Sequence, residues 1–325
     1  MDLMSPIFFV HVPKTAGTSF RLGAEEFFGR ERIVYDYGPD SSVTDPLVKD
    51  LLYGETKDFW GFKLACHQRD TAMIGGHVGV GRFLALFGAG RTLTFLREPL
   101  QRIASEYGHF VRHFDYKGSF EDFYSRPTMQ NRQSKLLQGI EIETIGFAGL
   151  TERYARSLEL LNAHFGTEIA LRADNRGKQS LQAVHEFSPR DEAELKRLNR
   201  RDLALYAQAV TLFDSRYHFF KEDKPWAHAR LDALKPDRIS GCAWWAGNSE
   251  EPVEVEVSIN DEQVAALLAV DLRPPLRRQQ PPRGGYVGFE LAVTLSADDR
   301  VQCRVAQTGQ RFPWKPRTLP RQEAG

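Results

Sequence analysis

The stretch that decides the fold is IFFVHVPKTAGTSF, residues 7–20. Residues 7–12 are apolar or β-prone and predict a buried strand, PKTAG predicts a tight turn, and residues 18–28 predict a helix. At such a strand-to-helix turn, backbone N–H groups and the positive end of the helix dipole point into one small space. The turn therefore favours a bound anion.

A second passage of the same kind follows later in the chain. Residues 91–98 contain the strand-like core TLTFL, and Pro99 stands where a helix can open and continue to about His113. Strands that alternate with helices predict an α/β domain with a parallel sheet flanked by helices. Further amphipathic helices are predicted over 129–138, 151–165 and 189–213.

The character of the sequence changes near residue 222. Residues 253–259 alternate apolar and charged side chains, Asn260-Asp261 is turn chemistry, and strands are predicted over 263–270, 288–295 and 300–305. This pattern predicts a small C-terminal antiparallel β-sandwich domain. The expected organisation is a catalytic domain over 1–222, a linker over 223–237, the accessory β domain over 238–310 and a tail over 311–325.

Composition excludes several classes of protein. The 325 residues include 43 Lys plus Arg and 43 Asp plus Glu, so no net field attracts nucleic acid, and any anion site must be local. The three cysteines lie far apart and favour neither a disulfide framework nor a zinc site. No run approaches 18 apolar residues and no basic leader precedes the first motif, so we expect a cytoplasmic protein without a transmembrane segment.

The first motif offers anion chemistry at several side chains. Lys14 supplies a positive charge, Gly17 allows close approach of the backbone, and the hydroxyls of Thr15, Thr18 and Ser19 add donors. A Walker A loop places its lysine after the glycine, whereas here the lysine comes first, which disfavours a nucleoside triphosphatase. The alternative interpretation is a plain strand-to-helix turn with a surface lysine.

The second motif pairs an arginine with a serine. Arg97 ends its predicted strand and Ser105 lies about two turns into the next helix, so both can face the sheet edge where ligands bind in open α/β sheets. Arginine offers a planar fork of donors that suits phosphate. Alternatively, Arg97 pairs with Glu98 and Ser105 is incidental.

His77 is the strongest candidate for a general base. It lies in Gly-Gly-His-Val-Gly, where small neighbours allow close approach of a substrate, and histidine titrates near neutral pH. The alternative is a structural histidine in a loop. His67 and Glu98 are weaker candidates, and His11 beside the first motif is better suited to supporting the loop.

These three motifs resemble those of carbohydrate sulfotransferases related to heparan sulfate 2-O-sulfotransferase. FFVHVPKTAGTSF resembles the family's 5′-phosphosulfate loop, and REPLQRIASEY resembles its R-D-P-x-x-R-x-x-S-x-Y pattern at the 3′-phosphate, with Glu98 in place of aspartate. GHVGVGRFLALFG resembles the G-H-V-x-F segment that carries the base. The family's second histidine, two positions earlier, is Gly75 here, so the acceptor chemistry can differ. The resemblance covers roughly residues 7–220.

The resemblance implies a P-loop-like sulfotransferase fold and the donor 3′-phosphoadenosine-5′-phosphosulfate (PAPS), with no metal. It implies that His77 is the base, that Lys14 also stabilises the leaving phosphate, and that Arg97 and Ser105 hold the 3′-phosphate. Asn175 to Lys178 resembles a late loop that closes over the donor. The implied phosphosulfate-binding residues are Lys14, Thr15, Ala16, Gly17, Thr18 and Ser19, with Lys178 from that late loop.

The expected acceptor is a glycan or glycolipid, modified by a bacterial enzyme before export. Arg112, Arg132 and Lys135, together with Arg153, can form a basic groove for an acidic glycan, or simply a solvated helical face. Trp244 and Trp245 can stack on sugars, although a structural role fits them better. Two rival functions remain: an ATP-dependent phosphoryl-transfer enzyme, and a non-catalytic glycan-binding protein on a degenerate nucleotide fold.

Overall fold

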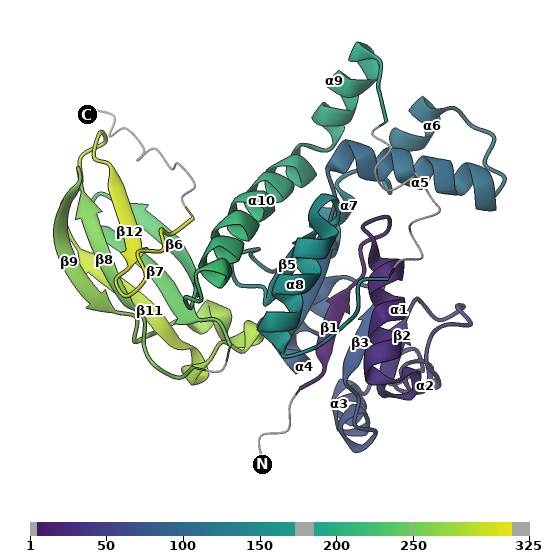
Figure 1. The fold of residues 1–325 in the computed structure, drawn as a ribbon, viewed down its shortest axis with the longest axis horizontal. Helices are drawn as coiled ribbons and strands as arrows, with labels where there is room; N and C mark the ends of the chain where they lie inside the picture. The colour runs from purple at the N-terminus through teal and green to yellow at the C-terminus, as the bar shows by residue number, and fades with distance from the viewer. Residues whose placement is uncertain (1–4, 173–184, 248, 314–325) are drawn as a thin grey trace. The chain divides into compact units, whose positions relative to one another are not determined.

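The computed structural model describes residues 5–172, 185–247 and 249–313 (Figure 1). The chain divides into two compact units. One comprises residues up to Phe87 together with Arg91–Phe213, and the other comprises Gly88–Gly90 with the residues from Asp214 onward. The first unit holds a parallel sheet and the second holds antiparallel sheets.

The parallel sheet contains five strands in the order β2-β3-β1-β4-β5. Every neighbouring pair is parallel, which confirms the predicted α/β class. The central strand β1 is buried along its whole length, as its sequence IFFV requires, because helices flank the sheet. The strands are β1 (Ile7–Val10), β2 (Ile33–Asp36), β3 (Met73–Gly76), β4 (Thr92–Leu96) and β5 (Phe147–Leu150).

Helices connect the strands, and Figure 1 shows α1 and α8 beside the sheet. The opening of α5 follows the prediction: Pro99 occupies its first turn and the Glu98 carboxylate accepts a hydrogen bond from the N–H of Gln101 at 2.7 Å. The α-helices are α1 (Gly17–Phe28), α2 (Pro46–Leu52), α3 (Phe59–Gln68), α4 (Leu84–Phe87), α5 (Pro99–His113), α6 (Phe120–Tyr124), α7 (Arg132–Leu136), α8 (Tyr154–Phe165), α9 (Pro189–Leu198) and α10 (Arg200–Lys221). Shorter 3₁₀ helices occupy Arg30–Arg32, Val80–Arg82, Thr151–Arg153, Pro274–Gln279 and Arg283–Gly285.

The helix predicted over 189–213 is in fact two helices, divided at Asn199. The Asn199 side chain is buried, donates to the carbonyl of Leu195 and accepts from the N–H of Asn131. Asn199 ends α9 with φ of −114° and ψ of 26°, and its bond to Asn131 anchors the break between the two helices. No helix in the described part of the chain is long and apolar enough to cross a membrane.

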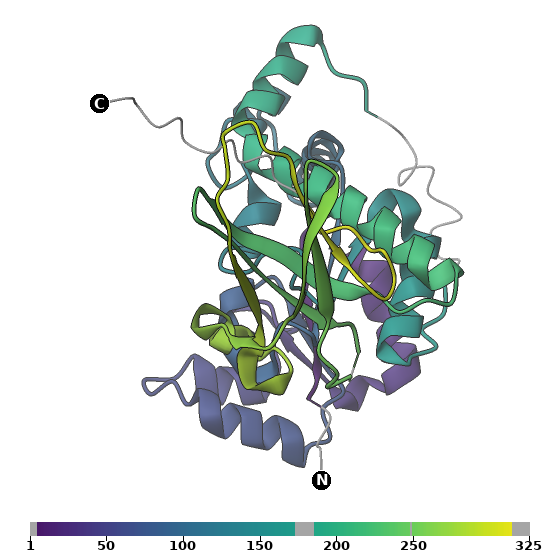
Figure 2. The same cartoon turned by 90° about the vertical axis from the view of Figure 1, so that its left-hand side faces the viewer.

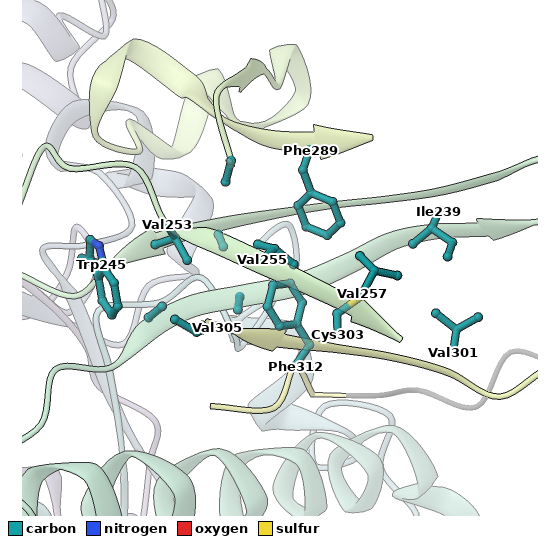
Figure 3. Close-up of a cluster of buried hydrophobic side chains, with 14 of the residues drawn as sticks. Ile239, Trp245, Val253, Val255, Val257, Phe289, Val301, Cys303, Val305 and Phe312 are labelled. Atoms are coloured by element: carbon teal, nitrogen blue, oxygen red, sulfur yellow. The ribbon is translucent and has the colours of Figure 1, made fainter. Parts of the chain in front are cut away.

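The second unit consists of two antiparallel sheets that share one hydrophobic core. Figure 2 shows their strands in green and yellow. In Figure 3, Val255 and Val257 of one sheet face Phe289 and Ile239 of the other. The turn at Asn260 and Asp261 has φ values of 51° and 71°, as its sequence predicts. The sheet orders are β10-β11-β7-β6 and β12-β8-β9, with β6 (Ala227–Lys235), β7 (Arg238–Trp245), β8 (Glu254–Ile259), β9 (Glu262–Leu268), β10 (Asp271–Leu272), β11 (Tyr286–Ala292) and β12 (Val301–Val305).

The domain boundaries differ from the prediction at both ends of this unit. Residues 223–237 do not form a linker, because most of them form β6, which pairs with β7. Pro225 and Pro236, which suggest a linker in the sequence, lie just outside the two ends of that strand, where proline is tolerated. In the expected tail, Phe312 packs into the shared core.

Trp244 and Trp245 are both buried. Trp245 belongs to the shared core, and Trp244 stacks on the His228 ring with centroids 5.3 Å apart. The structural interpretation of these tryptophans therefore holds, and neither ring offers a platform for sugars.

Candidate functional site

The loop between β1 and α1 has the backbone of an anion-binding turn. Lys14 and Ala16 adopt left-handed conformations with φ of 68° and 63°. Ala16 is the N-cap of α1 and provides no side-chain cap for the first N–H groups of the helix. These N–H groups and the helix dipole are therefore available to an anion at this turn.

The side chains of this loop divide into two sets. Lys14 and Ser19 are half-buried and Thr18 is exposed, so a ligand can reach them. Thr15 is fully buried, and its hydroxyl donates to the carbonyl of Val12 at 2.8 Å. The Thr15 hydroxyl thus stabilises the turn and, contrary to the prediction, is not placed to donate to a ligand.

Gly17 is required by its contact with His11. A Cβ atom built at Gly17 would lie 2.1 Å from both Cδ2 and Nε2 of the His11 ring. The ring is itself buried, so it has little room to move away. The glycine thus permits α1 to begin directly against the end of β1. The predicted close approach of the backbone to a ligand stays a prediction.

Arg97, in the second motif, lies next to Lys14 of the first motif. It follows β4, is only 3% exposed, and its Nη1 lies 3.4 Å from the carbonyl oxygen of Lys14. The described residues provide Arg97 with no ion-pair partner, although the charges of Glu152 and Glu98 favour its charged form. Desolvation lowers the pKa of this guanidinium, so a bound anion would stabilise it. The alternative pairing of Arg97 with Glu98 is not formed, because the Glu98 carboxylate caps α5.

Gln133 clamps the backbone of Arg97. Its amide oxygen accepts from the Arg97 N–H at 3.0 Å, and its amide nitrogen donates to the Arg97 carbonyl at 2.9 Å. Gln133 is completely buried at α7. This side chain replaces a missing sheet partner and fixes the position from which the guanidinium extends.

Ser105 and Arg112 lie on one face of α5, together with His109, at helical spacings of four and three residues. Ser105 is half-buried, and within the described residues its hydroxyl makes no hydrogen bond. His109 is close enough to Lys14 and Arg112 for both charges to lower its pKa, after the larger effect of burial. This helix face therefore extends the site from the loop toward the exposed Arg112.

His77 follows β3 directly and lies beside His11 at the end of β1. The centroids of the two imidazole rings are 4.5 Å apart, and the Tyr37 ring lies 4.7 Å from that of His77. The His77 residue is exposed to solvent. The protein around its ring nevertheless removes part of the hydration of the imidazole. Desolvation first, and then the charges of Arg132 and Arg21, lower its pKa to about 4, while Glu106 acts in the opposite direction. The ring is therefore neutral at pH 7 and able to accept a proton.

Of the residues predicted to bind the acceptor, Arg132 lies near His77. Its Nη1 is 2.7 Å from Oε1 of Glu106, and the other oxygen of this buried carboxylate is 2.5 Å from Nη1 of Arg102. Lys135 instead donates from Nζ to the carbonyl of Pro127 at 2.6 Å, and Arg153 lies over the Phe213 ring. Of these three residues, Arg132 is the one whose charge acts on His77. The acceptor groove stays a prediction.

Three further predicted residues remain to be placed against this arrangement. Lys178 is outside the described residues. Glu98 is occupied as the cap of α5. His67 lines a separate pocket with Pro6, which precedes β1, so it lies at the sheet edge opposite to His77. The last two are therefore poor candidates for the base.

The sequence interpretation missed Tyr37, Gln133 and Glu106. Tyr37 follows β2 just as His77 follows β3, so assignment of that strand would have placed it at the same edge. Glu106 lies four residues after Arg102, a spacing typical of a helical ion pair. Nothing local distinguishes Gln133, whose role depends on a distant strand.

The described residues contain no group of three or more His, Cys, Asp and Glu side chains arranged to hold a metal ion. No protein-family model, curated protein or solved structure matches this chain.

Proposed function

We propose that the protein transfers the sulfuryl group of PAPS to a hydroxyl of a glycan or glycolipid. The contact between Arg97 and the Lys14 carbonyl carries this proposal, because it joins two anion-binding motifs at one edge of the sheet. PAPS carries anionic groups on both sides of its ribose, the 5′-phosphosulfate and the 3′-phosphate. Two adjacent sites, one a helix N-terminus with a lysine and one a desolvated arginine, suit such a donor.

In the proposed reaction the acceptor oxygen attacks sulfur while the bond from sulfur to the phosphate oxygen breaks. The acceptor proton passes to the His77 imidazole, and the electron pair of the broken bond stays on the 5′-phosphate of the product, 3′-phosphoadenosine 5′-phosphate (PAP). Lys14 and the N–H groups at the start of α1 stabilise that developing charge. Arg97 and Ser105 hold the 3′-phosphate.

The low pKa of His77 is consistent with this role. The cations Arg132 and Arg21 lower the pKa of His77, and a bound donor would add negative charge beside them. Negative charge raises the pKa of a neighbouring imidazole, so donor binding should strengthen the base. The pKa of His77 would thus rise toward neutral pH only when the donor is bound.

The first experiment titrates PAP into the full chain by calorimetry. Arg97→Ala should weaken binding strongly, whereas Arg91→Ala, which removes a desolvated arginine from the other end of β4, should leave it unchanged. Labelled PAPS is then offered with a panel of uronic-acid and neutral glycans. Absence of PAP binding would overturn the proposal.

The same experiment distinguishes the alternatives. PAP binding without turnover on any glycan would favour a non-catalytic glycan-binding protein. Thermal stabilisation by ATP with magnesium, and none by PAP, would favour a phosphoryl-transfer enzyme.

A further inference from the structure

Three aromatic side chains meet where three neighbouring strands end. His11 follows β1 within one residue, His77 follows β3 and Tyr37 follows β2, and the sheet order places β3 between the other two. The N–H of His11 donates to the carbonyl of Gly76 at 2.9 Å, which continues the pairing of β1 and β3. The His77 ring is therefore held edge-on by the rings of His11 and Tyr37, at centroid distances of 4.5 and 4.7 Å.

A hydrogen bond joins the two supporting rings. Nδ1 of His11 lies 2.9 Å from the Tyr37 hydroxyl. This bond restrains the rotation of the His11 ring, whose Cδ2 and Nε2 atoms face Gly17 at the start of α1.

The surroundings of His11 keep its ring neutral. The groups that face His11 are His77, Arg21 and Lys14, in addition to Tyr37. Burial first, and then the neighbouring His77, Arg21 and Lys14, hold the pKa of His11 well below its usual range. A neutral His11 leaves His77 free to take up a proton without a second imidazolium beside it.

We propose that Tyr37 and His11 are positioning residues for His77: the Tyr37 hydroxyl holds the His11 ring through Nδ1, and both rings orient the His77 imidazole beside the loop. The reaction that this orientation serves rests on the proposed function above. The positioning itself depends only on the contacts among the three rings. His77 additionally faces Arg132 from α7, Glu106 from α5 and Arg21 from α1.

Tyr37→Phe tests the proposal because it removes the hydroxyl and keeps the ring. Tyr35→Phe is the matched control: it removes a hydroxyl from the same segment that bonds to Glu25 at 2.8 Å and not to His11. Nitrogen-15 NMR of the histidine rings should show the Nδ1 signal of His11 shifted in Tyr37→Phe, which lacks the hydrogen bond, and unchanged in Tyr35→Phe. A His11 Nδ1 signal that is the same in all three proteins would overturn the proposal.

Turnover provides the second readout. Tyr37→Phe should lower kcat about tenfold, the size expected for the loss of one orienting hydrogen bond, with the Kd for PAP unchanged. His11→Phe should cause a similar loss, and the double variant should be no worse than His11→Phe alone, because both act through one contact. Additive losses would contradict a shared role. If PAP fails to bind or no glycan is sulfated, the proposed function fails while the NMR result still decides the positioning.

Discussion

The guanidinium of Arg97 lies 3.4 Å from the carbonyl oxygen of Lys14, although 83 positions separate the two residues in the chain. They meet because β1 and β4 are adjacent parallel strands, with Val10 opposite Thr94, so the segments that follow both strands leave the sheet at the same edge. Parallel pairing thus brings the two turns of the proposed anion site together.

Replacement of Arg97 by alanine should weaken PAP binding selectively through the 3′-phosphate. The loss of a charge-assisted interaction should cost about 1.5–3 kcal/mol. Adenosine 5′-phosphate, which lacks the 3′-phosphate, should bind the variant and the wild type equally in the same calorimetric titration. An equal loss for both ligands would place Arg97 at the 5′-phosphate instead.

Gln133→Leu should destabilise the protein, because it leaves the buried N–H and carbonyl of Arg97 without partners. The free energy of unfolding in urea should fall by about 2–4 kcal/mol. Gln130→Leu is the control, since the Gln130 side chain is half-buried and donates chiefly to one carbonyl, that of Ser125 at 2.8 Å. Equal effects of the two substitutions would argue against a clamp.

Gly17→Ala should abolish measurable PAP binding, because the new methyl group collides with the His11 ring and displaces the start of α1. Gly81→Ala is the matched control, as a Cβ at that position meets nothing within 4 Å. In a His11→Ala background the collision is removed, so Gly17→Ala should then have a smaller effect on stability. If the Gly17→Ala protein bound PAP normally, contact with the His11 ring would not be the reason that position 17 requires glycine.

The acid limb of the pH profile should report His77. For kcat/KM this limb should lie near the pKa of about 4 in the free enzyme, and for kcat it should lie higher because the bound donor is anionic. Arg132→Gln removes the cation that most lowers this pKa, so NMR titration should show the His77 pKa shifted upward. If the acid limb did not move in Arg132→Gln, the titrating base would be a group other than His77.

Stability should fall with acidification because of His11. Its folded-state pKa is far below the unfolded value near 6.5, so below about pH 6.5 the unfolded chain binds a proton that the folded protein does not. The contribution of neutral His11 is therefore complete above that pH and is lost as the pH falls toward the folded-state pKa. Urea unfolding at pH 7 and pH 5 should differ less in His11→Phe than in the wild type; an identical difference would contradict this assignment.

Several elements could be predicted because their signals are local. Residues 7–28 and 91–113 each combine a buried strand, a turn residue and a helix opening, and residues 253–261 combine alternation with Asn-Asp turn chemistry. The short strands β3 and β5 could not be predicted, since MIGG and FAGL contain glycines that weaken any strand signal. β3 is stabilised by parallel neighbours on both sides, β1 and β2, and β5 by its one neighbour in the described sheet, β4.

The sequence by itself determined the two turns, the residue types that favour an anion, and a histidine between glycines. Tertiary structure alone decided which of these groups meet: Arg97 with the Lys14 carbonyl, His77 with His11 and Tyr37, and Arg132 with Glu106. It also directed the Thr15 hydroxyl inward, away from the ligand role its residue type suggests. The physical reason is that residue type and spacing act within a few turns of the chain, whereas strand order brings distant strand ends to one edge.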